Sequence, residues 1–311
     1  MAGQIGEKER ACYIPVVTDP VAWYREFAPC AALQSEVYAF FSFVPGPLVA
    51  QHDRPLLREI AFRDATFCSP QFADGHVSLV FELGRTCQAD GRWDTSSSAV
   101  RGTILGPMSR VGRTEGSDRP LMVGVYFRSG QIAALLRSPM SDLTDSAVDV
   151  EDVWGSSGAR LADDLPELEE TARIDHLEAV LLARLRTASP GTGSIDLQQV
   201  TRHILRRHGH VPVEGLARAA GVSRQHLTRQ FREHVGIGPK LYCRLARFHS
   251  ALVYAGCRGQ VDWAAAALDM GYADQSHMIA EFRQFGGVTP QTLANRDWFH
   301  PFIERARAAR R

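Results

Sequence analysis

The chain has 311 residues, of which 45% are hydrophobic and 23% charged, a composition typical of globular domains with apolar cores. No apolar run approaches the roughly 20 residues of a membrane span, and the start lacks the apolar region of a secretory signal, so we expect neither a membrane protein nor an exported one. The net charge of zero hides a division: residues 1–193 carry 18 basic and 26 acidic residues, whereas residues 194–311 carry 17 and 9, which favours a polyanion as the partner of the second part.

The first part of the chain, residues 1–155, is predicted to be β-rich. Its apolar or alternating segments are short, and each ends at Gly or Pro: EVYAFFSFVPGP (36–47), GHVSLVFELG (75–84), SAVRGTILGP (98–107) and PLMVGVYFRSG (120–130). In the second of them Val77, Leu79, Phe81 and Leu83 fall on one face. Short strands separated by Gly and Pro turns indicate a barrel or a sandwich.

Residues 156–188 turn helical. An apolar stripe recurs there at three-to-four spacing, made of Leu177, Val180, Leu181 and Leu185. Two interpretations stay open, because this stripe can pack on the β-rich domain or on a partner subunit in a homodimer. Residues 189–194, within a stretch rich in Pro, Gly and Ser, are the predicted linker.

Residues 195–298 are predicted to be helical throughout, and residues 299–311 form a basic tail. The first helix places Leu197, Val200, Ile204 and Leu205 on one face and stops at Gly209. A second short helix follows Pro212. A long helix from Pro239 to Gly256 then joins two copies of a repeat.

The repeat is the most informative feature of the sequence. GVSRQHLTRQFREHVGIGP (221–239) and GYADQSHMIAEFRQFGGVTP (271–290) superpose with an offset of 51 residues. The matching pairs are Leu227 with Met278, Phe231 with Phe282, Gly236 with Gly287 and Pro239 with Pro290. Each copy also has an Ala four residues before its first Gly. This is the pattern of a helix-turn-helix, which places its second helix in a DNA major groove.

In the first unit Ala217 supplies the small residue at the helix crossing and Gly221 the turn. Ser223 is a natural N-cap for the recognition helix, and its hydroxyl or the free N–H groups beside it can hold a phosphate. The residues expected to face DNA are Ser223, Arg224, Gln225, His226, Thr228 and Arg229. Arg and Gln suit guanine and adenine edges, whereas the alternative for each of these side chains is a plain solvated surface.

In the second unit Ala267 and Gly271 take the corresponding structural positions, and Asp274 takes the capping position. The residues expected on its DNA side are Asp274, Gln275, Ser276, His277 and Arg283. This set carries fewer charges than the first. We therefore expect the first unit to supply most of the base discrimination and the second unit more of the anchoring.

The segment from about 195 to 295 resembles the DNA-binding domain of the AraC/XylS family of bacterial transcription regulators. The family signature stands in ALDMGYADQSHMIAEFRQFGGVTP (267–290). The sequence departs from it at Met278, where an aromatic is usual, at Glu281, where small or basic residues are common, and at Gly286, where a bulky residue is common.

The resemblance implies an α+β multidomain protein with an all-α, seven-helix double helix-turn-helix domain at its C-terminus. Double-stranded DNA of a promoter or operator is its implied partner, RNA polymerase is a further one, and activation is the family's usual effect. The N-terminal part is similar, more weakly, to a cupin-like sensor domain of unknown ligand. A small-molecule effector is therefore expected, but the resemblance assigns no effector-binding residue.

The first part shows little sign of catalysis. It contains no nucleophile elbow, P-loop or dinucleotide fingerprint, and its cysteines form no C-x-x-C pair, so we expect reduced thiols, a cytoplasmic location and no cofactor. A metal site from His52, His76 and Glu82 is the weaker alternative to ordinary histidines, so no metal is expected. Arg128 can face an anionic effector or pair with an acid of its own domain.

Two rival functions remain open at this stage. The chain could be an enzyme, a metallo-cupin whose helical domain only localises it on DNA. It could also be a constitutive DNA-binding factor whose N-terminal domain only dimerises. Neither has a sequence motif of its own, and a non-enzymatic, effector-responsive regulator is the leading hypothesis.

Overall fold

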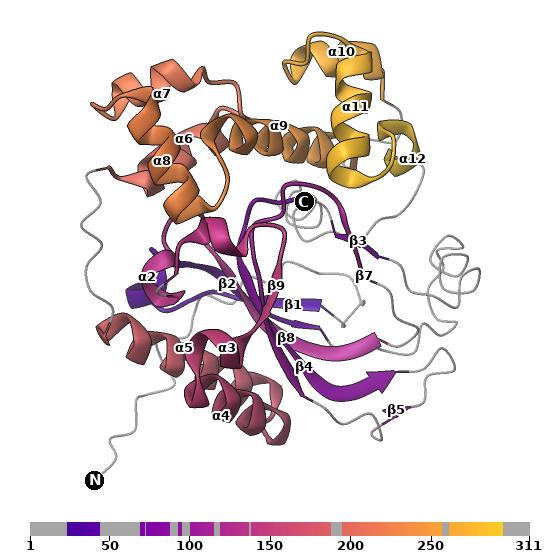
Figure 1. The fold of residues 1–311 in the computed structure, drawn as a ribbon. Coiled ribbons are helices and arrows are strands. Elements are labelled where there is room, and N and C mark those ends of the chain that lie inside the picture. The colour runs from indigo at the N-terminus through magenta and orange to yellow at the C-terminus, as the bar shows by residue number, and fades with distance from the viewer. Residues whose placement is uncertain are drawn as a thin grey trace.

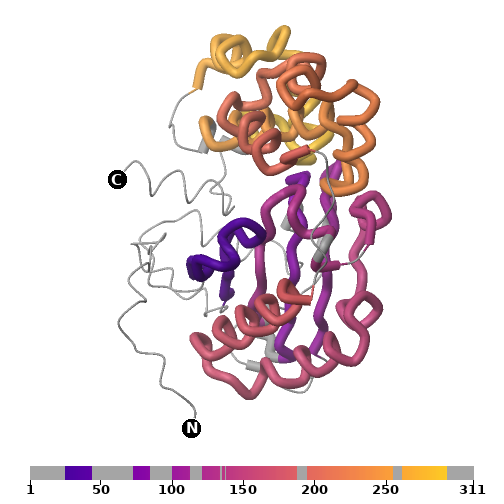
Figure 2. The backbone as a smooth tube through the Cα atoms, turned by 90° about the vertical axis from the view of Figure 1, so that its left-hand side faces the viewer, coloured from indigo at the N-terminus to yellow at the C-terminus, as the bar shows by residue number. Residues whose placement is uncertain are grey.

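The computed structural model describes residues 24–43, 69–71, 73–87, 93–94, 100–114, 119–136, 138–187, 195–256 and 261–294. A domain built on an antiparallel sheet lies against a domain made of helices (Figures 1 and 2). In the part of the chain so described, no helix is long and apolar enough to cross a membrane.

The main sheet has the strand order β1-β2-β8-β4-β6-β9, with β5 paired to β4. Its strands are β1 (Tyr24–Phe27), β2 (Val37–Phe43), β4 (Ser78–Cys87), β5 (Trp93–Asp94), β6 (Arg101–Leu105), β8 (Arg119–Phe127) and β9 (Ala147–Asp149). A separate pair joins β3 (Ser69–Gln71) to β7 (Gly112–Thr114). All pairings are antiparallel, as hairpin-rich segments with Gly and Pro turns favour.

The alternation predicted for β4 is confirmed. Val77, Leu79, Phe81 and Leu83 are all buried in one cluster, and Leu79 and Phe81 stand opposite Val125 and Val123 of β8. Because side chains alternate across a strand, this single register sends every apolar residue of the segment into the same core.

The helices of the N-terminal domain cover this core. They are η1 (Ala31–Leu33), α2 (Ala133–Leu136), η2 (Met140–Leu143), α3 (Val150–Trp154), α4 (Ser156–Asp164), η3 (Leu165–Glu167) and α5 (Glu170–Thr187). Leu177 and Leu181 of α5 are almost fully buried, and α5 contacts β2 and β8. Of the two interpretations of the apolar stripe, the structure therefore shows packing on the chain's own sheet.

The helical domain contains seven helices in its described residues, the number that the resemblance implied. They are α6 (Leu197–Arg206), α7 (Val213–Ala219), α8 (Arg224–Val235), α9 (Pro239–Gly256), α10 (Trp263–Asp269), α11 (Gln275–Gly286) and α12 (Pro290–Ala294). The long helix α9 runs between the unit α7–α8 and the unit α10–α11 (Figure 1). Phe231, Phe248 and Phe282 are fully buried along this axis.

The two units are built alike because the same local signals recur in each. Gly221 and Gly271 adopt φ values of +68° and +69° at the two turns, a region that L side chains rarely enter. Ala217 and Ala267 are buried at the helix crossings. The predicted small-residue and turn positions are thus confirmed in both units.

Candidate DNA-binding surface and the groove between the domains

The recognition helix α8 begins as predicted. The Ser223 hydroxyl accepts a hydrogen bond from the His226 N–H at 3.1 Å, which satisfies one of the free N–H groups of the first turn. Arg224, Gln225 and Arg229 are exposed, whereas His226 and Thr228 are partly buried. The outer face of α8 is therefore polar and accessible, as a helix that reads base edges must be.

Several of these side chains already have contacts within the unit. The Arg224 guanidinium lies 2.8 Å from Glu214 of α7, and Arg229 Nη2 lies 3.0 Å from His226 Nδ1. The Thr228 hydroxyl donates to the Arg224 carbonyl. Since the Arg224–Glu214 pair is exposed on both sides, its net stabilisation is small, and Arg224 can exchange the carboxylate for a phosphate or a guanine at little cost.

The second recognition helix, α11, has the same cap chemistry. Asp274 accepts from the His277 N–H at 2.7 Å, and Gln275, Ser276, His277 and Arg283 are exposed. His277 also lies against the Tyr272 ring and 3.5 Å from the Glu281 carboxylate, so it faces the α11 core side as well as solvent. The predicted residues of α11 include one arginine, against two in the predicted set of α8. An acidic N-cap also lowers the local positive potential that a phosphate would meet.

A buried ion pair connects α9 to α11. Glu281 is only 1% exposed, and its carboxylate accepts from Arg244 Nε at 2.7 Å, while Arg244 Nη2 also donates to Gln284. The guanidinium lies 4.9 Å from the centre of the Phe285 ring. Burial, followed by the nearby Glu281 carboxylate, raises the pKa of the Tyr272 hydroxyl. The unusual Glu281 of the sequence is therefore a fixed connection between helices.

The N-terminal domain contacts the two units at equivalent places. Near the end of α8, the Thr144 hydroxyl donates to the Gly236 carbonyl at 2.9 Å. Near the end of α11, Ala73 N–H donates to the Phe285 carbonyl at 2.9 Å and Val111 N–H to the Gln284 carbonyl at 3.2 Å. Gly236 and Gly287 are the left-handed C-caps of the two helices. These contacts satisfy carbonyl groups that a helix end leaves free.

The recognition face of α8 borders the N-terminal domain. A hollow of about 660 Å³ is lined by Arg224, Gln225, Thr228 and Arg229 on one side and by Pro139 and Ser141 on the other. DNA that enters along α8 would therefore pass close to η2. The sequence carries no signal for this proximity, because Pro139 and Ser141 lie more than 80 positions before α8.

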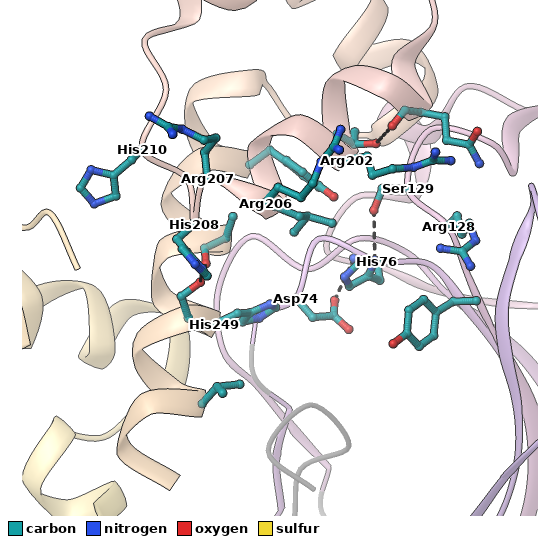
Figure 3. Close-up of a pocket in the computed structure, with 18 of the residues that line it drawn as sticks. Asp74, His76, Arg128, Ser129, Arg202, Arg206, Arg207, His208, His210 and His249 are labelled. Carbon is teal, nitrogen blue, oxygen red and sulfur yellow. Dashed lines mark hydrogen bonds between the residues drawn. The ribbon is translucent and has the colours of Figure 1, made fainter. Parts of the chain in front are cut away.

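A larger groove of about 1050 Å³ separates the sheet from α6 and α9 (Figure 3). Asp74, His76 and Arg128 line it from the N-terminal domain, and Arg202 and Arg206 line it from α6. The predicted apolar face of α6 is wrong at one position: Leu205 is 42% exposed and lines this groove. The helix turns Leu197, Val200 and Ile204 inward, and position 205 lies beyond the edge of that stripe.

The floor of the groove holds titratable groups with shifted pKa values. Burial raises the pKa of Asp74 to about 7 and lowers that of His249 to about 4. The neutral His249 ring contacts the Ala73 carbonyl through Nε2 at 2.9 Å, so the proton sits on Nε2, because a carbonyl only accepts. Asp74 accepts from the His76 N–H, and His76 Nδ1 lies 3.0 Å from the Ser129 hydroxyl.

The structure bears on two predictions for the N-terminal domain, the role of Arg128 and the metal site. Arg128 donates to the Gln34 carbonyl and lies 5.3 Å from the Tyr38 ring, so among the described residues it pairs with no acid and lines the groove instead. His52 lies outside the described residues. Those that are described contain no group of three His, Cys, Asp or Glu side chains that could hold a metal ion.

Comparison with known proteins identifies both parts of the chain. Residues 216–296 match the family model described as a helix-turn-helix domain, and residues 25–149 match a domain of unknown function, DUF6597. No curated protein matches the sequence significantly.

Among solved structures, the chain is similar to ToxT from Vibrio cholerae. One ToxT structure is 12% identical with a TM-score of 0.41, covering 74% of this chain and 93% of that one. A ToxT structure with bound unsaturated fatty acid is 10% identical with a TM-score of 0.37, covering 73% and 90%. A third, with a bound naphthalenyl butenoic acid, is 10% identical with a TM-score of 0.40, covering 73% and 93%.

Proposed function

We propose that this chain, a DNA-binding transcription regulator with an AraC-type helix-turn-helix domain, reads two successive segments of one promoter under the control of its N-terminal domain. Two helix-turn-helix units on one rigid helix suit major-groove segments about 34 Å apart on one face of the duplex. The observation that carries the proposal is the repetition itself. Both recognition helices are capped at their first turn, and both present exposed polar side chains.

We propose further that the two helix-turn-helix units have different roles in DNA binding. In α8 the exposed Arg224, Gln225 and Arg229 supply donors for guanine and adenine edges, and the Ser223 cap leaves N–H groups for a phosphate. In α11 Gln275, Ser276 and His277 are the polar residues of the first turn, with Arg283 farther along the helix. The unit around α8 therefore sets most of the sequence preference, and the unit around α11 anchors the domain.

Control by the N-terminal domain is the second part of the proposal. That domain contacts Gly236 after α8 and Phe285 near the end of α11, and a groove lined by both domains lies between these contacts. A small molecule that prefers one arrangement of the two domains shifts the population toward it. DNA binding then changes because the position of η2 beside α8 changes with the arrangement.

The test is DNA binding by the full chain to its own upstream DNA across a salt series. Affinity should fall steeply with salt, because phosphate contacts release counterions. Arg229→Ala should weaken specific binding by about 1–3 kcal/mol and leave binding to random DNA nearly unchanged, if Arg229 reads a base. Arg160→Ala, which removes an exposed arginine of α4 far from the helical domain, is the matched control and should change neither.

Two results would contradict the proposal. Salt-independent or absent binding to the upstream DNA would remove DNA reading altogether. An equal loss of affinity for specific and random DNA in Arg229→Ala would mean that this residue contacts the phosphate backbone. The proposal that α8 sets the sequence preference would then lose its main residue.

A further inference from the structure

The groove between the domains has a concentration of positive charge on α6. Arg202 and Arg206 lie one turn apart on α6, and Arg207 follows directly. All three are exposed and line the groove, as Figure 3 shows. Among the described residues none of them forms an ion pair, whereas Arg25, Arg224 and Arg244 each contact a carboxylate. Like charges at this spacing repel one another and favour an anion beside them.

We propose that this groove binds a phosphorylated small molecule with a hydroxyl-bearing body, such as a sugar phosphate or a nucleotide. Its phosphate lies against the α6 arginines. A guanidinium binds phosphate through two parallel N–H donors, and several guanidiniums together match its charge and its several oxygens better than they match one carboxylate. The groove, at about 1050 Å³, is at the upper end of the sizes that small-molecule sites have.

The floor of the groove suits the polar body of such a ligand. The Tyr242 hydroxyl is buried, lines the groove and lies beside the Ser129 hydroxyl. The nearby Ser129 hydroxyl is engaged with His76 Nδ1 and, more weakly, with the Gly75 carbonyl. A ligand hydroxyl in the groove can accept from the Tyr242 O–H and so gain a hydrogen bond away from water. Asp74, on the same floor, is an acceptor for ligand hydroxyls.

The rim adds an apolar contribution. Tyr38 and Leu205 are two of the three large hydrophobic residues that are exposed in the described part of the chain, and both line the groove. They lie on opposite domains, Tyr38 on β2 and Leu205 on α6. A flat ring of the ligand therefore covers apolar surface on both sides, which stabilises the domains in contact.

The consequence for regulation rests on the function proposed above, but binding itself does not. A ligand held by α6 and by the sheet domain stabilises the arrangement in which both are close, and the stabilisation grows with the logarithm of the ligand concentration above its dissociation constant. Its effect on DNA binding follows from the position of η2 beside α8. Ligand binding and DNA reading are thus separate measurements on separate residues.

The experiment is calorimetric titration of the full chain with pyrophosphate and with adenosine monophosphate, and with palmitate as an apolar carboxylate. We expect both phosphate compounds to bind and palmitate to bind at least tenfold more weakly. Arg202→Gln and Arg206→Gln should each weaken pyrophosphate binding at least tenfold. Arg160→Gln is the matched control, because it removes an exposed arginine on α4, outside both sites, and should leave pyrophosphate binding unchanged. Arg229→Gln tests whether the anion lies on the DNA-binding surface of α8 instead.

Three results would overturn the inference. The first is no binding of either phosphate compound by the folded chain. The second is an equal loss of pyrophosphate binding in Arg229→Gln, which would place the anion on the DNA-binding surface. The third is a loss of DNA affinity in Arg206→Gln as large as in Arg229→Gln, which would make α6 a contact to the DNA backbone. Failure of DNA binding in the wild-type chain would instead contradict the proposed function.

Discussion

The buried pair between Arg244 and Glu281 gives the sharpest test of how the second unit is held. Glu281 has a side chain only 2% exposed, whereas the Arg244 side chain is 32% exposed. The two ends of the pair are therefore unequal. Removing Arg244 leaves a buried carboxylate with only the His277 ring, 3.5 Å away, beside it. Removing Glu281 leaves a guanidinium that still reaches water, Gln284 and the Phe285 ring.

The magnitudes follow from this inequality. Breaking a buried ion pair by removing one partner costs about 3–5 kcal/mol, because the remaining charge is not compensated. We expect Arg244→Met to lie in that range. Glu281→Gln keeps the shape and an acceptor for Arg244, and the charge left behind is partly hydrated, so we expect about 1–2 kcal/mol. Arg244→Met combined with Glu281→Leu should recover most of the loss, since replacing both charges by apolar groups of similar volume is often neutral.

The assay is equilibrium unfolding in urea, with DNA binding measured under conditions where each variant is folded. The free energy of unfolding should fall more for Arg244→Met than for Glu281→Gln, and the double variant should be more stable than Arg244→Met alone. The DNA affinity of Arg244→Met should also fall, because the pair fixes the orientation of the second unit. Equal losses in the two single variants, or strictly additive losses in the double variant, would refute the reasoning from unequal burial.

Three further predictions concern the caps, the turns and the groove. Ser223→Ala should cost about 1 kcal/mol in unfolding free energy, measured by denaturation, because the first turn of α8 loses its acceptor. Gly221→Ala and Gly271→Ala should each lose about 1–2 kcal/mol of unfolding free energy, because both positions have a left-handed backbone. Gly271→Ala should lose more stability in a thermal melt, since its Cβ would overlap the His210 ring, whereas nothing lies within 4 Å of a Cβ at position 221. Burial raises the pKa of Asp74 from 3.8 to about 7, so its stabilising effect is complete below about pH 4 and is lost as the pH rises to about 7. Asp74→Asn stays neutral, so its melting temperature should exceed that of the wild type by a margin that grows from about pH 4 to about pH 7 and is constant above that.

The helical domain could be predicted closely because its signals are local. A turn needs a Gly at positive φ, and a helix start needs an acceptor within three residues; both requirements can be read from neighbouring letters. Gly221, Ser223 and Asp274 were identified in this way, and the structure confirms their conformations and hydrogen bonds. Local periodicity was less reliable at the edge of a stripe, which is why Leu205 was wrongly placed inside the core.

The contacts between distant segments could not be predicted in this way. Glu281 is an odd residue when only its own helix is considered, and its reason is Arg244, 37 positions earlier on another helix. The groove combines Asp74, Arg128 and Arg202 from three separate segments, and each of them has an ordinary local sequence. Their proximity depends on how the sheet domain meets α6 and α9, which no pattern within a single segment specifies.

The way in which the two domains meet suits a regulator. The described residues form two separate hydrophobic clusters, and Ala73 is the one member of the helical cluster that comes from the N-terminal domain. Its N–H donates to the Phe285 carbonyl and its carbonyl accepts from His249, so directed hydrogen bonds join two domains that each keep a core of their own. Each net hydrogen bond contributes only about 1 kcal/mol, which is less than one tightly bound ligand supplies. Such an interface lets the N-terminal domain move relative to the helical domain without disturbing either helix-turn-helix unit.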